Sequence, residues 1–404
     1  MLEIRRIKAE ELEQCRKIWT IVYNERRDFH LQDDENPLED PAEWRWAAFE
    51  DGKMQSCMNE IPYLMRFDYH DVKMSGIGGV GTLPEARRGG YIRLIFEKLL
   101  PEAYENGVVF SNLTPFSHAF YRKFGYELAC ARNEITIPTQ EFAELKLRGK
   151  FTPIFPDDDT SALAFVHNAY IKPLNHGIRR DYWVDNRAWR IFTNEHPYST
   201  GTFLYLWRND EGKPKSYLKY RHEKVEQKNI MRVKELAFID REGLYGALSL
   251  VSGLSSQYDM FKWAAPTFLD PADFIANMWA VDQRIIPRDM TRIVNVKTAL
   301  SLMRCPDGEG CYTLEVVDKQ INANNGRFLV EYSSEGNASN VRVSKTTKAP
   351  DMYCTIAALS QLVMGYRTLE NALLTKQTDI EVLTNHKTLD KVWTLRPQHI
   401  TEYF

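Results

Sequence analysis

The sequence predicts two consecutive α/β sections followed by a smaller α+β section. The chain has 404 residues, more than a single hydrophobic core usually serves. Its first part alternates strand and helix patterns in the order strand, helix, hairpin, strand, helix and strand, and a weaker form of that order returns from Arg180. Three strands and two helices then follow in succession. We place the three sections at residues 1–147, 148–290 and 291–404.

Each element of the first section follows from a local pattern of apolar residues. These residues alternate in a strand and recur every three to four positions in a helix. Asp51-Gly52 is typical of a hairpin turn, and Gly107 is a helix stop. The predicted elements are a strand at 2–8, a helix at 9–24, strands at 43–50, 55–68 and 73–83, a helix at 90–106 and a strand at 108–113.

The second and third sections are assigned in the same way. In the second we expect strands at 202–208, 216–221 and 232–239, a helix at 244–254 and a strand near 260–264. This order is typical of a degenerate duplication of the first section. In the third, a three-stranded meander at 312–318, 326–332 and 340–345 precedes helices at 355–364 and 369–374.

Composition excludes several classes of protein. With 44% hydrophobic and 26% charged residues, the chain is expected to be soluble and globular. A net charge of −3 gives no bulk attraction to nucleic acid or to an anionic membrane. Six cysteines form no CxxC pair and have no histidine at ligand spacing, so we expect no metal site. The charged N-terminus and the absence of a long apolar run predict a cytoplasmic protein.

The joint between the strand at 73–83 and the following helix is rich in glycine and arginine. Glycines bring the backbone close to a ligand, and the N–H groups at a helix start attract a diphosphate. The joint lacks the GK[ST] of a Walker loop, and Pro84 interrupts any dinucleotide-type turn. Gly78, Gly79 and Gly81 within one strand predict a bulge or a close backbone approach. The matching joint of the second section, Asp240 to Gly243, is acidic, so we do not expect it to hold the same anion.

Two motifs carry a resemblance to a known superfamily. The spacing Arg87-x-x-Gly90-x-Ile92 resembles the pyrophosphate-binding motif R/Q-x-x-G-x-G/A of the GNAT N-acetyltransferases, with Ile in place of the final Gly or Ala. Downstream, Phe120-Tyr121 followed by Gly125-Tyr126 resembles the FY-x-x-x-GF/GY signature of the same fold. The two motifs are one helix and one strand apart, as that fold requires.

Three further features resemble the Eis (enhanced intracellular survival) family of these acetyltransferases. They are the length of the chain, its degenerate second section and a C-terminal section similar to sterol carrier proteins. The stretch from Met290 to Val296 is similar to the entry into that family's third domain. The resemblance implies acetyl-CoA as co-substrate, an amine acceptor such as an aminoglycoside, and a ring-like homohexamer.

The resemblance also implies a set of residues that bind acetyl-CoA. A strand pairs with the pantetheine arm, a turn holds the diphosphate, and two residues lie along the far side of the cofactor. The strand residues are Val80, Gly81 and Thr82; the turn residues are Arg88, Gly89, Gly90, Tyr91, Ile92 and Arg93; the far-side residues are Phe116 and Ser117.

Acetyl transfer needs an acid for the departing thiolate and an unprotonated amine. A thiol has a pKa of about 8.5 and a phenol about 10, so a positioned tyrosine is a plausible acid. Tyr121 is the candidate for that role, and the carboxylate of the terminal Phe404 is implied at the same site. An α-carboxyl pKa near 3.5 makes that group a weak base unless burial raises it. Phe404 is therefore either a general base or an anion that orients a cationic substrate.

The sequence leaves the acceptor and one alternative function open. The acidic run between His30 and Asp40 suits a cationic amine such as an aminoglycoside, a polyamine or a lysine side chain, although such runs are often only solvated surface. The alternative is a protein that binds lipid or acyl-CoA without turnover. Transfer of longer acyl groups is a further option that the sequence does not separate.

Overall fold

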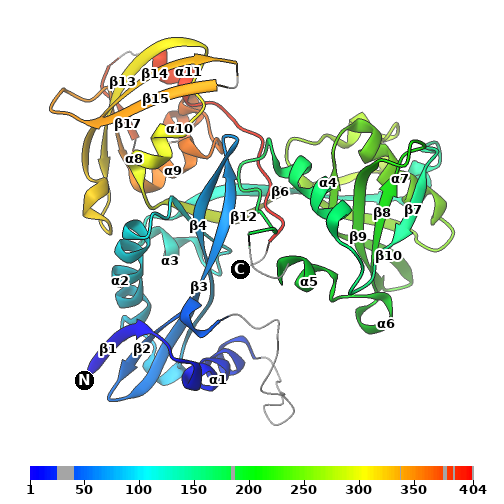
Figure 1. Cartoon of the computed structure of the whole chain (residues 1–404), viewed down its shortest axis with the longest axis horizontal. Helices are drawn as coiled ribbons and strands as arrows, with labels where there is room; N and C mark the ends of the chain where they lie inside the picture. The colour runs from blue at the N-terminus through cyan, green and yellow to red at the C-terminus, as the bar shows by residue number, and fades with distance from the viewer. Residues whose placement is uncertain (25–40, 183–186, 337, 376–379, 385–386, 403–404) are drawn as a thin grey trace. The chain divides into compact units, whose positions relative to one another are not determined.

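A computed structural model describes the chain except for residues 25–40, 183–186, 337, 376–379, 385–386 and 403–404 (Figure 1). The acidic run from His30 to Asp40 and Phe404 therefore lie outside the described residues. The chain divides into two compact units that do not follow its order. Unit 1 contains residues 1–130, 288–396 and 402–404, and unit 2 contains residues 131–287 and 397–401.

The first sheet of unit 1 has the strand order β1-β2-β3-β4-β5-β12. All neighbouring strands are antiparallel except β4 and β5, which are parallel. The six strands are β1 (Leu2–Arg6), β2 (Arg45–Glu50), β3 (Lys53–Phe67), β4 (His70–Thr82), β5 (Phe110–Leu113) and β12 (Asp282–Ile293). The predicted order of the first section is confirmed, whereas β12 was not predicted.

Two helices cover opposite faces of this sheet. On β2, Ala47 and Phe49 belong to the core beneath α1 (Leu12–Tyr23), while Trp46 and Ala48 belong to the core beneath α2 (Tyr91–Glu105). This alternation follows from the two-residue period of a strand. The short helix α3 (His118–Arg122) adds its aromatic side chains to the α2 side.

The second sheet of unit 1 has the order β15-β14-β13-β16-β17. The predicted meander and the two following helices are confirmed, while β16, β17, α8 and α11 were not predicted. The strands are β13 (Gly308–Val317), β14 (Gly326–Glu335), β15 (Ala338–Lys345), β16 (Met352–Thr355) and β17 (Ile380–Val382); the helices are α8 (Val296–Ser301), α9 (Ile356–Val363), α10 (Leu369–Thr375) and α11 (Lys387–Val392).

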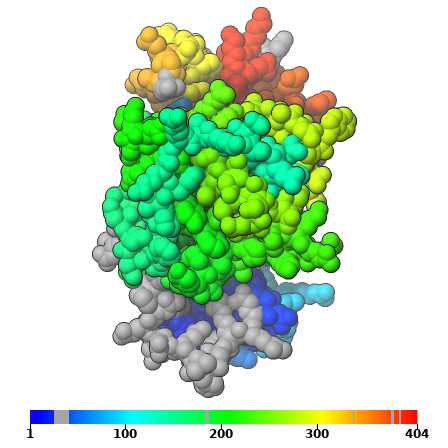
Figure 2. Space-filling model, turned by 90° about the vertical axis from the view of Figure 1, so that its right-hand side faces the viewer, coloured from blue at the N-terminus to red at the C-terminus, as the bar shows by residue number. Residues whose placement is uncertain are grey.

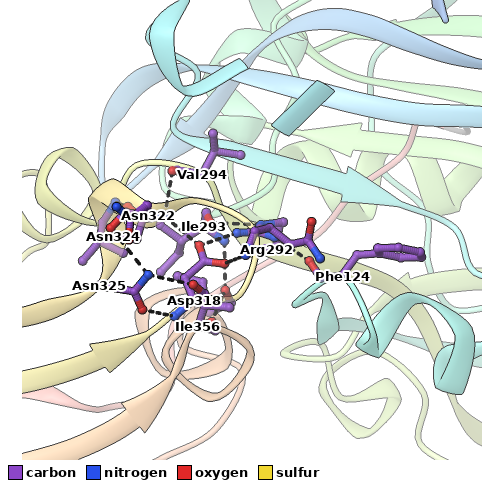
Figure 3. Close-up of polar contacts among 12 residues, drawn as sticks. Phe124, Arg292, Ile293, Val294, Asp318, Asn322, Asn324, Asn325 and Ile356 are labelled. Atoms are coloured by element: carbon purple, nitrogen blue, oxygen red, sulfur yellow. Dashed lines mark hydrogen bonds and ion pairs between the residues drawn. The ribbon is translucent and has the colours of Figure 1, made fainter. Parts of the chain in front are cut away.

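A buried ion pair links the two sheets of unit 1 (Figure 3). Arg292 in β12 and Asp318 after β13 are both fully buried, and their side chains form an ion pair. The Arg292 guanidinium also donates a hydrogen bond to the carbonyl of Phe124, which follows α3. Asn324 donates to Asp318 at 2.9 Å and to the carbonyl of Val294 at 3.0 Å. These bonds leave neither charge without a partner in the interior.

Unit 2 repeats the plan of the first section. Its sheet has the order β6-β11-β10-β9-β8-β7, in which β10 and β11 are parallel and the other neighbours antiparallel. The strands are β6 (Glu127–Pro138), β7 (Lys150–Pro153), β8 (Thr202–Arg208), β9 (Pro214–Val225), β10 (Lys228–Phe238) and β11 (Met260–Pro266); the helices are α4 (Ser161–Ile171), α5 (Arg187–Thr193), α6 (Pro197–Thr200) and α7 (Arg241–Gly253). Figure 2 shows the surface of this unit as spheres, coloured from cyan-green to yellow-green.

The start of α7 carries its own anion. The Asp240 carboxylate accepts a hydrogen bond from the N–H of Gly243 at 2.9 Å and forms an ion pair with Lys215. A carboxylate at this position satisfies a helix N–H group and the helix dipole. The acidic joint of the second copy therefore caps its helix from within the chain.

Replacing Arg292 with Met is expected to lower the free energy of unfolding by about 3–5 kcal/mol, because Asp318 then stays buried without its cation. Urea denaturation measures the change. Arg327→Met is the matched control, because Arg327 pairs with Glu315 at the partly exposed surface and should cost less than about 1 kcal/mol. Adding Asp318→Leu to Arg292→Met should restore part of the loss. Equal effects of the two arginine variants would contradict this role of the buried pair.

Candidate active site

Strand β4 carries a bulge at its glycines. Thr82 pairs with Ser56 and Gly81 with Cys57, after which the register shifts and Gly78 pairs with Asn59. Inside the shift, Gly79 has a φ of 57°, in the left-handed region that favours glycine. The bulge expected from the glycine pattern is confirmed.

β4 and β5 part at this point. Their parallel pairing ends with Ile77 opposite Leu113, and β5 ends there, whereas β4 continues to Thr82. The edge of residues 78–82 that follows the paired region therefore no longer faces β5. An extended ligand arm can pair with that edge as another strand would.

Helix α1 supports the bulge from the other side. Its Trp19 indole donates to the carbonyl of Gly79, and the hydroxyl of Tyr23 donates to the carbonyl of Val80 at 3.2 Å. A Cβ on Gly79 would lie 3.0 Å from the Trp19 ring, so this position has little room for a side chain. The helix that carries both residues was predicted at 9–24, but no signal in the sequence pointed to Tyr23.

The turn after β4 sets the direction in which α2 begins. Arg88 and Gly90 have φ values of 71° and 79°, and the helix begins at Tyr91. A Cβ on Gly89 would lie 2.5 Å from the Tyr91 ring, so a side chain at this position would displace that ring. The N–H groups of the first helical turn have no partner inside the helix and carry a partial positive charge. The exposed Arg88 and the Arg93 guanidinium, which is 3.0 Å from Glu97, add cationic groups.

A cavity of about 990 Å³ within unit 1 joins these features. Nine of the thirteen expected site residues line it, at positions in β4, the turn, α2 and the segment around α3: Val80, Thr82, Arg88, Gly90, Tyr91, Ile92, Arg93, Phe116 and Tyr121. The volume is at the upper end of the range of small-molecule sites.

The other four expected site residues are not among the described residues that line this cavity. A Cβ on Gly81 would lie 3.0 Å from Ile18 of α1, Gly89 shapes the turn, and the Ser117 hydroxyl accepts a hydrogen bond from the N–H of Phe120 at 3.4 Å at the start of α3. Phe404 lies outside the described residues. The chain before it is held in unit 2, where the Ile400 carbonyl accepts a hydrogen bond from Arg132 at 2.6 Å.

Sequence reasoning missed several residues of the cavity wall. They come from α1, from the segment around α3 and from the third section: Val22, Tyr23, Thr114, Lys123 and Gln320. The hydroxyl of Thr114 donates to the carboxylate of Asp289 in β12 at 2.6 Å. Gln320 follows Asp318, so the ion pair of Arg292 places a residue of the third section at this cavity.

Tyr121 lies in an aromatic wall of the cavity. Its side chain is 2% exposed, and its ring lies 5.3 Å from Phe116 and 5.1 Å from Phe120, measured between centroids. Burial raises the pKa of the Tyr121 phenol above its ordinary value near 10, with smaller contributions from Tyr23 and Tyr126. The phenol is therefore protonated at neutral pH.

Tyr126 is the second phenol of the motif and has a different environment. Its hydroxyl lies 2.7 Å from the Ser111 hydroxyl in the core, and its side chain does not line the cavity. No hydrogen bond joins the Tyr121 hydroxyl to any residue that the structure describes. Of the two phenols, Tyr121 is the one that lines the cavity.

Two features are absent from the residues that the structure describes. In that part of the chain, no group of three or more His, Cys, Asp or Glu side chains is arranged to hold a metal ion. None of its helices combines the length and apolar character that crossing a membrane requires.

Models of protein families match three stretches of the chain. Two models, each described as an acetyltransferase (GNAT) domain, match residues 3–129 and 178–293. A model described as a sterol carrier protein domain matches residues 296–401. Among curated proteins, none matches the sequence of this chain.

Solved structures share the fold over the whole chain, each covered in full by the match. A probable N-acyltransferase of unknown function from Enterococcus faecalis V583 has 21% identity and a TM-score of 0.86. A GCN5-related N-acetyltransferase from Anabaena variabilis has 20% identity and a TM-score of 0.86. Eis1 from Mycobacterium abscessus has 18% identity and a TM-score of 0.82.

These likenesses confirm the resemblance at the level of the fold. The parted strands, the basic turn and the buried tyrosine occur within the first matched acetyltransferase domain. The second match covers most of the repeated plan of unit 2. The chain belongs to the GNAT-family N-acetyltransferases, with two GNAT domains followed by a sterol carrier protein domain.

Proposed function

We propose that the protein transfers the acetyl group of acetyl-CoA to a primary amine of a cationic acceptor. The observation that carries this proposal is the cavity of about 990 Å³ that joins a basic turn to the Tyr121 phenol. A ligand with a diphosphate at one end and a thioester at the other matches both. The acceptor amine belongs to an aminoglycoside-like molecule, a polyamine or a lysine side chain.

The turn binds the diphosphate. The first N–H groups of α2, including those of Tyr91, Ile92 and Arg93, donate to phosphate oxygens, and Arg88 and Arg93 supply positive charge. Gly89 and Gly90 let the backbone approach the phosphates closely. Phe116, whose side chain is 70% exposed, and Ser117 lie along the far side of the cofactor.

The parted edge of β4 binds the pantetheine arm. Val80, Gly81 and Thr82 offer backbone groups beyond the end of β5, and the amides of pantetheine have the donors and acceptors to pair with them. One N–H group of this edge stabilises the oxyanion that forms on the acetyl carbonyl. The bulge, supported by Trp19, sets the direction of that group.

The proposed reaction has two bond changes. The amine nitrogen attacks the thioester carbon, and the carbon–sulfur bond of the tetrahedral intermediate then breaks. The departing sulfur takes the proton of Tyr121 as the carbon–sulfur bond breaks. The amine nitrogen loses one proton after its attack, and that proton restores the Tyr121 phenol. Because burial raises the pKa of Tyr121, the phenol carries its proton at neutral pH and can donate to the sulfur while the carbon–sulfur bond breaks.

The Phe404 carboxylate is proposed as the general base or as the anion that orients the ammonium group of the acceptor. Hydrogen bonds within unit 2 hold the segment before it: Asn175 donates to the Pro397 carbonyl at 2.9 Å, and the N–H of His399 donates to the Asn175 carbonyl at 3.1 Å. Because hydrogen bonds already fix this segment, ordering the last residues of the chain costs less conformational entropy.

From the resemblance to Eis proteins, we also propose that the protein is a cytoplasmic homohexamer.

Tyr121→Phe is expected to lower kcat by about 100-fold, because the thiolate then leaves without an internal acid. The Kd of acetyl-CoA should stay within about twofold, since the ring remains in place. Tyr126→Phe is the matched control, which should keep kcat and cost about 1 kcal/mol of stability through its bond to Ser111. Stopped-flow and equilibrium binding measure the two quantities. A Tyr121→Phe enzyme with wild-type kcat would remove the acid role.

The raised pKa of Tyr121 predicts the alkaline limb of the pH profile. An acid whose pKa is raised keeps its proton to higher pH, so kcat should not fall before about pH 10, the ordinary value for tyrosine. The rising limb at lower pH should follow deprotonation of the amine. A profile of kcat at saturating acetyl-CoA measures both limbs. A fall centred between pH 8 and 9 would assign the limb to another group.

Deleting Phe404 is expected to lower kcat/KM for the amine at least tenfold and to leave acetyl-CoA binding unchanged. Release of CoA is followed with a panel of aminoglycosides, polyamines and lysine peptides, using the chain with its Phe404 carboxylate free and the same chain carrying a C-terminal extension. Full activity of the extended chain would remove the carboxylate role alone. Failure of every amine with the free carboxylate would favour the lipid or acyl-CoA carrier instead.

A further inference from the structure

A second cavity of about 260 Å³ lies in unit 1 beside the first. Lys123 and Gln320 line both cavities, so the two meet at these residues. The wall of this cavity is formed by residues at the end of α3, Arg122 and Lys123, and by residues of the third section, Lys319, Gln320 and Thr355. Lys319 and Gln320 belong to the third section and lie outside the sequence motifs of the first domain.

The charges of this second cavity leave two free cations. Arg122 is neutralised by Glu127, with two hydrogen bonds of 2.8 Å. Asp318 is neutralised by Arg292. In the described part of the chain, neither Lys123 nor Lys319 has an ion-pair partner, and both are exposed. The space between α3 and the third section is therefore positively charged.

We propose that this second cavity binds the 3′-phosphate on the adenosine of CoA, held by Lys123 and Lys319. This inference rests on the proposed use of acetyl-CoA. The thioester end of that molecule is assigned to Tyr121 and the diphosphate to the turn at Arg88 and Arg93, which leaves the phosphate monoester without a partner. A phosphate monoester carries a charge between −1.5 and −2 at neutral pH, which suits two lysines.

The position of Lys123 supports the same assignment. Lys123 lines the first cavity together with Phe116, which is 70% exposed and offers a flat face to a purine base. The nucleoside thus bridges the diphosphate turn and the boundary between the two cavities. The third section then contributes to the choice of cofactor through Lys319, and its position depends on the Arg292 ion pair.

The test compares acetyl-CoA with acetyl-3′-dephospho-CoA at low ionic strength, where exposed charges are least screened. For the wild type, removal of the 3′-phosphate should raise KM about tenfold with kcat within about twofold. Lys319→Gln and Lys123→Gln should each raise the KM of acetyl-CoA about threefold to fivefold and leave the KM of the dephospho form unchanged. Lys348→Gln, an exposed lysine of the same section that lines neither of the two cavities, should change neither value.

Equal KM values of the two cofactors in the wild type would overturn the inference, as would a Lys319→Gln effect of the same size on both cofactors. Neither result would affect the proposed acetyl transfer. If no amine is acetylated, the proposed function fails separately. Calorimetric titration with CoA and 3′-dephospho-CoA then tests the site by itself, with the same tenfold ratio of Kd expected and a ratio of one overturning it.

Discussion

The buried ion pair between Arg292 and Asp318 is the interaction on which the active region of unit 1 depends. Arg292 belongs to β12, which pairs with β5, and Asp318 follows the first strand of the second sheet. The same guanidinium donates to the carbonyl of Phe124, just after α3. Three segments that are far apart in the sequence are therefore fixed by one planar group with several donors.

The Arg292 guanidinium is connected to Tyr121 through Phe124, which follows α3. Phe124 donates its N–H to the carbonyl of Tyr121 at 2.9 Å, and Gly125 follows with a φ of 81°. A Cβ on Gly125 would lie 2.7 Å from Ile356 of α9. The glycine of the FY-x-x-x-GY motif thus serves two needs, a left-handed turn and contact with the third section. The sterol carrier domain supports the helix that carries the proposed acid.

The two GNAT domains share one plan of strands and helices but differ in the joint between strand and helix. In the first, β4 has glycines, parts from β5 and leads to a helix start beside arginines. In the second, β10 keeps a bulge near Val233, but α7 begins at the carboxylate of Asp240. A helix N-terminus already bonded to a carboxylate offers less to an external phosphate. The difference explains why one copy binds the cofactor in our proposal and the other does not.

The sequence by itself determined the first domain's order of elements, the bulge and the basic turn, and it pointed to Tyr121. These depend on residues adjacent in the chain, where glycine conformation, helix starts and apolar periodicity act locally. Tertiary structure alone decided that β12 completes the first sheet and that Tyr23, Lys123 and Gln320 line the cavity. Their side chains carry no local signal, because their roles arise from packing between elements that are up to about three hundred residues apart.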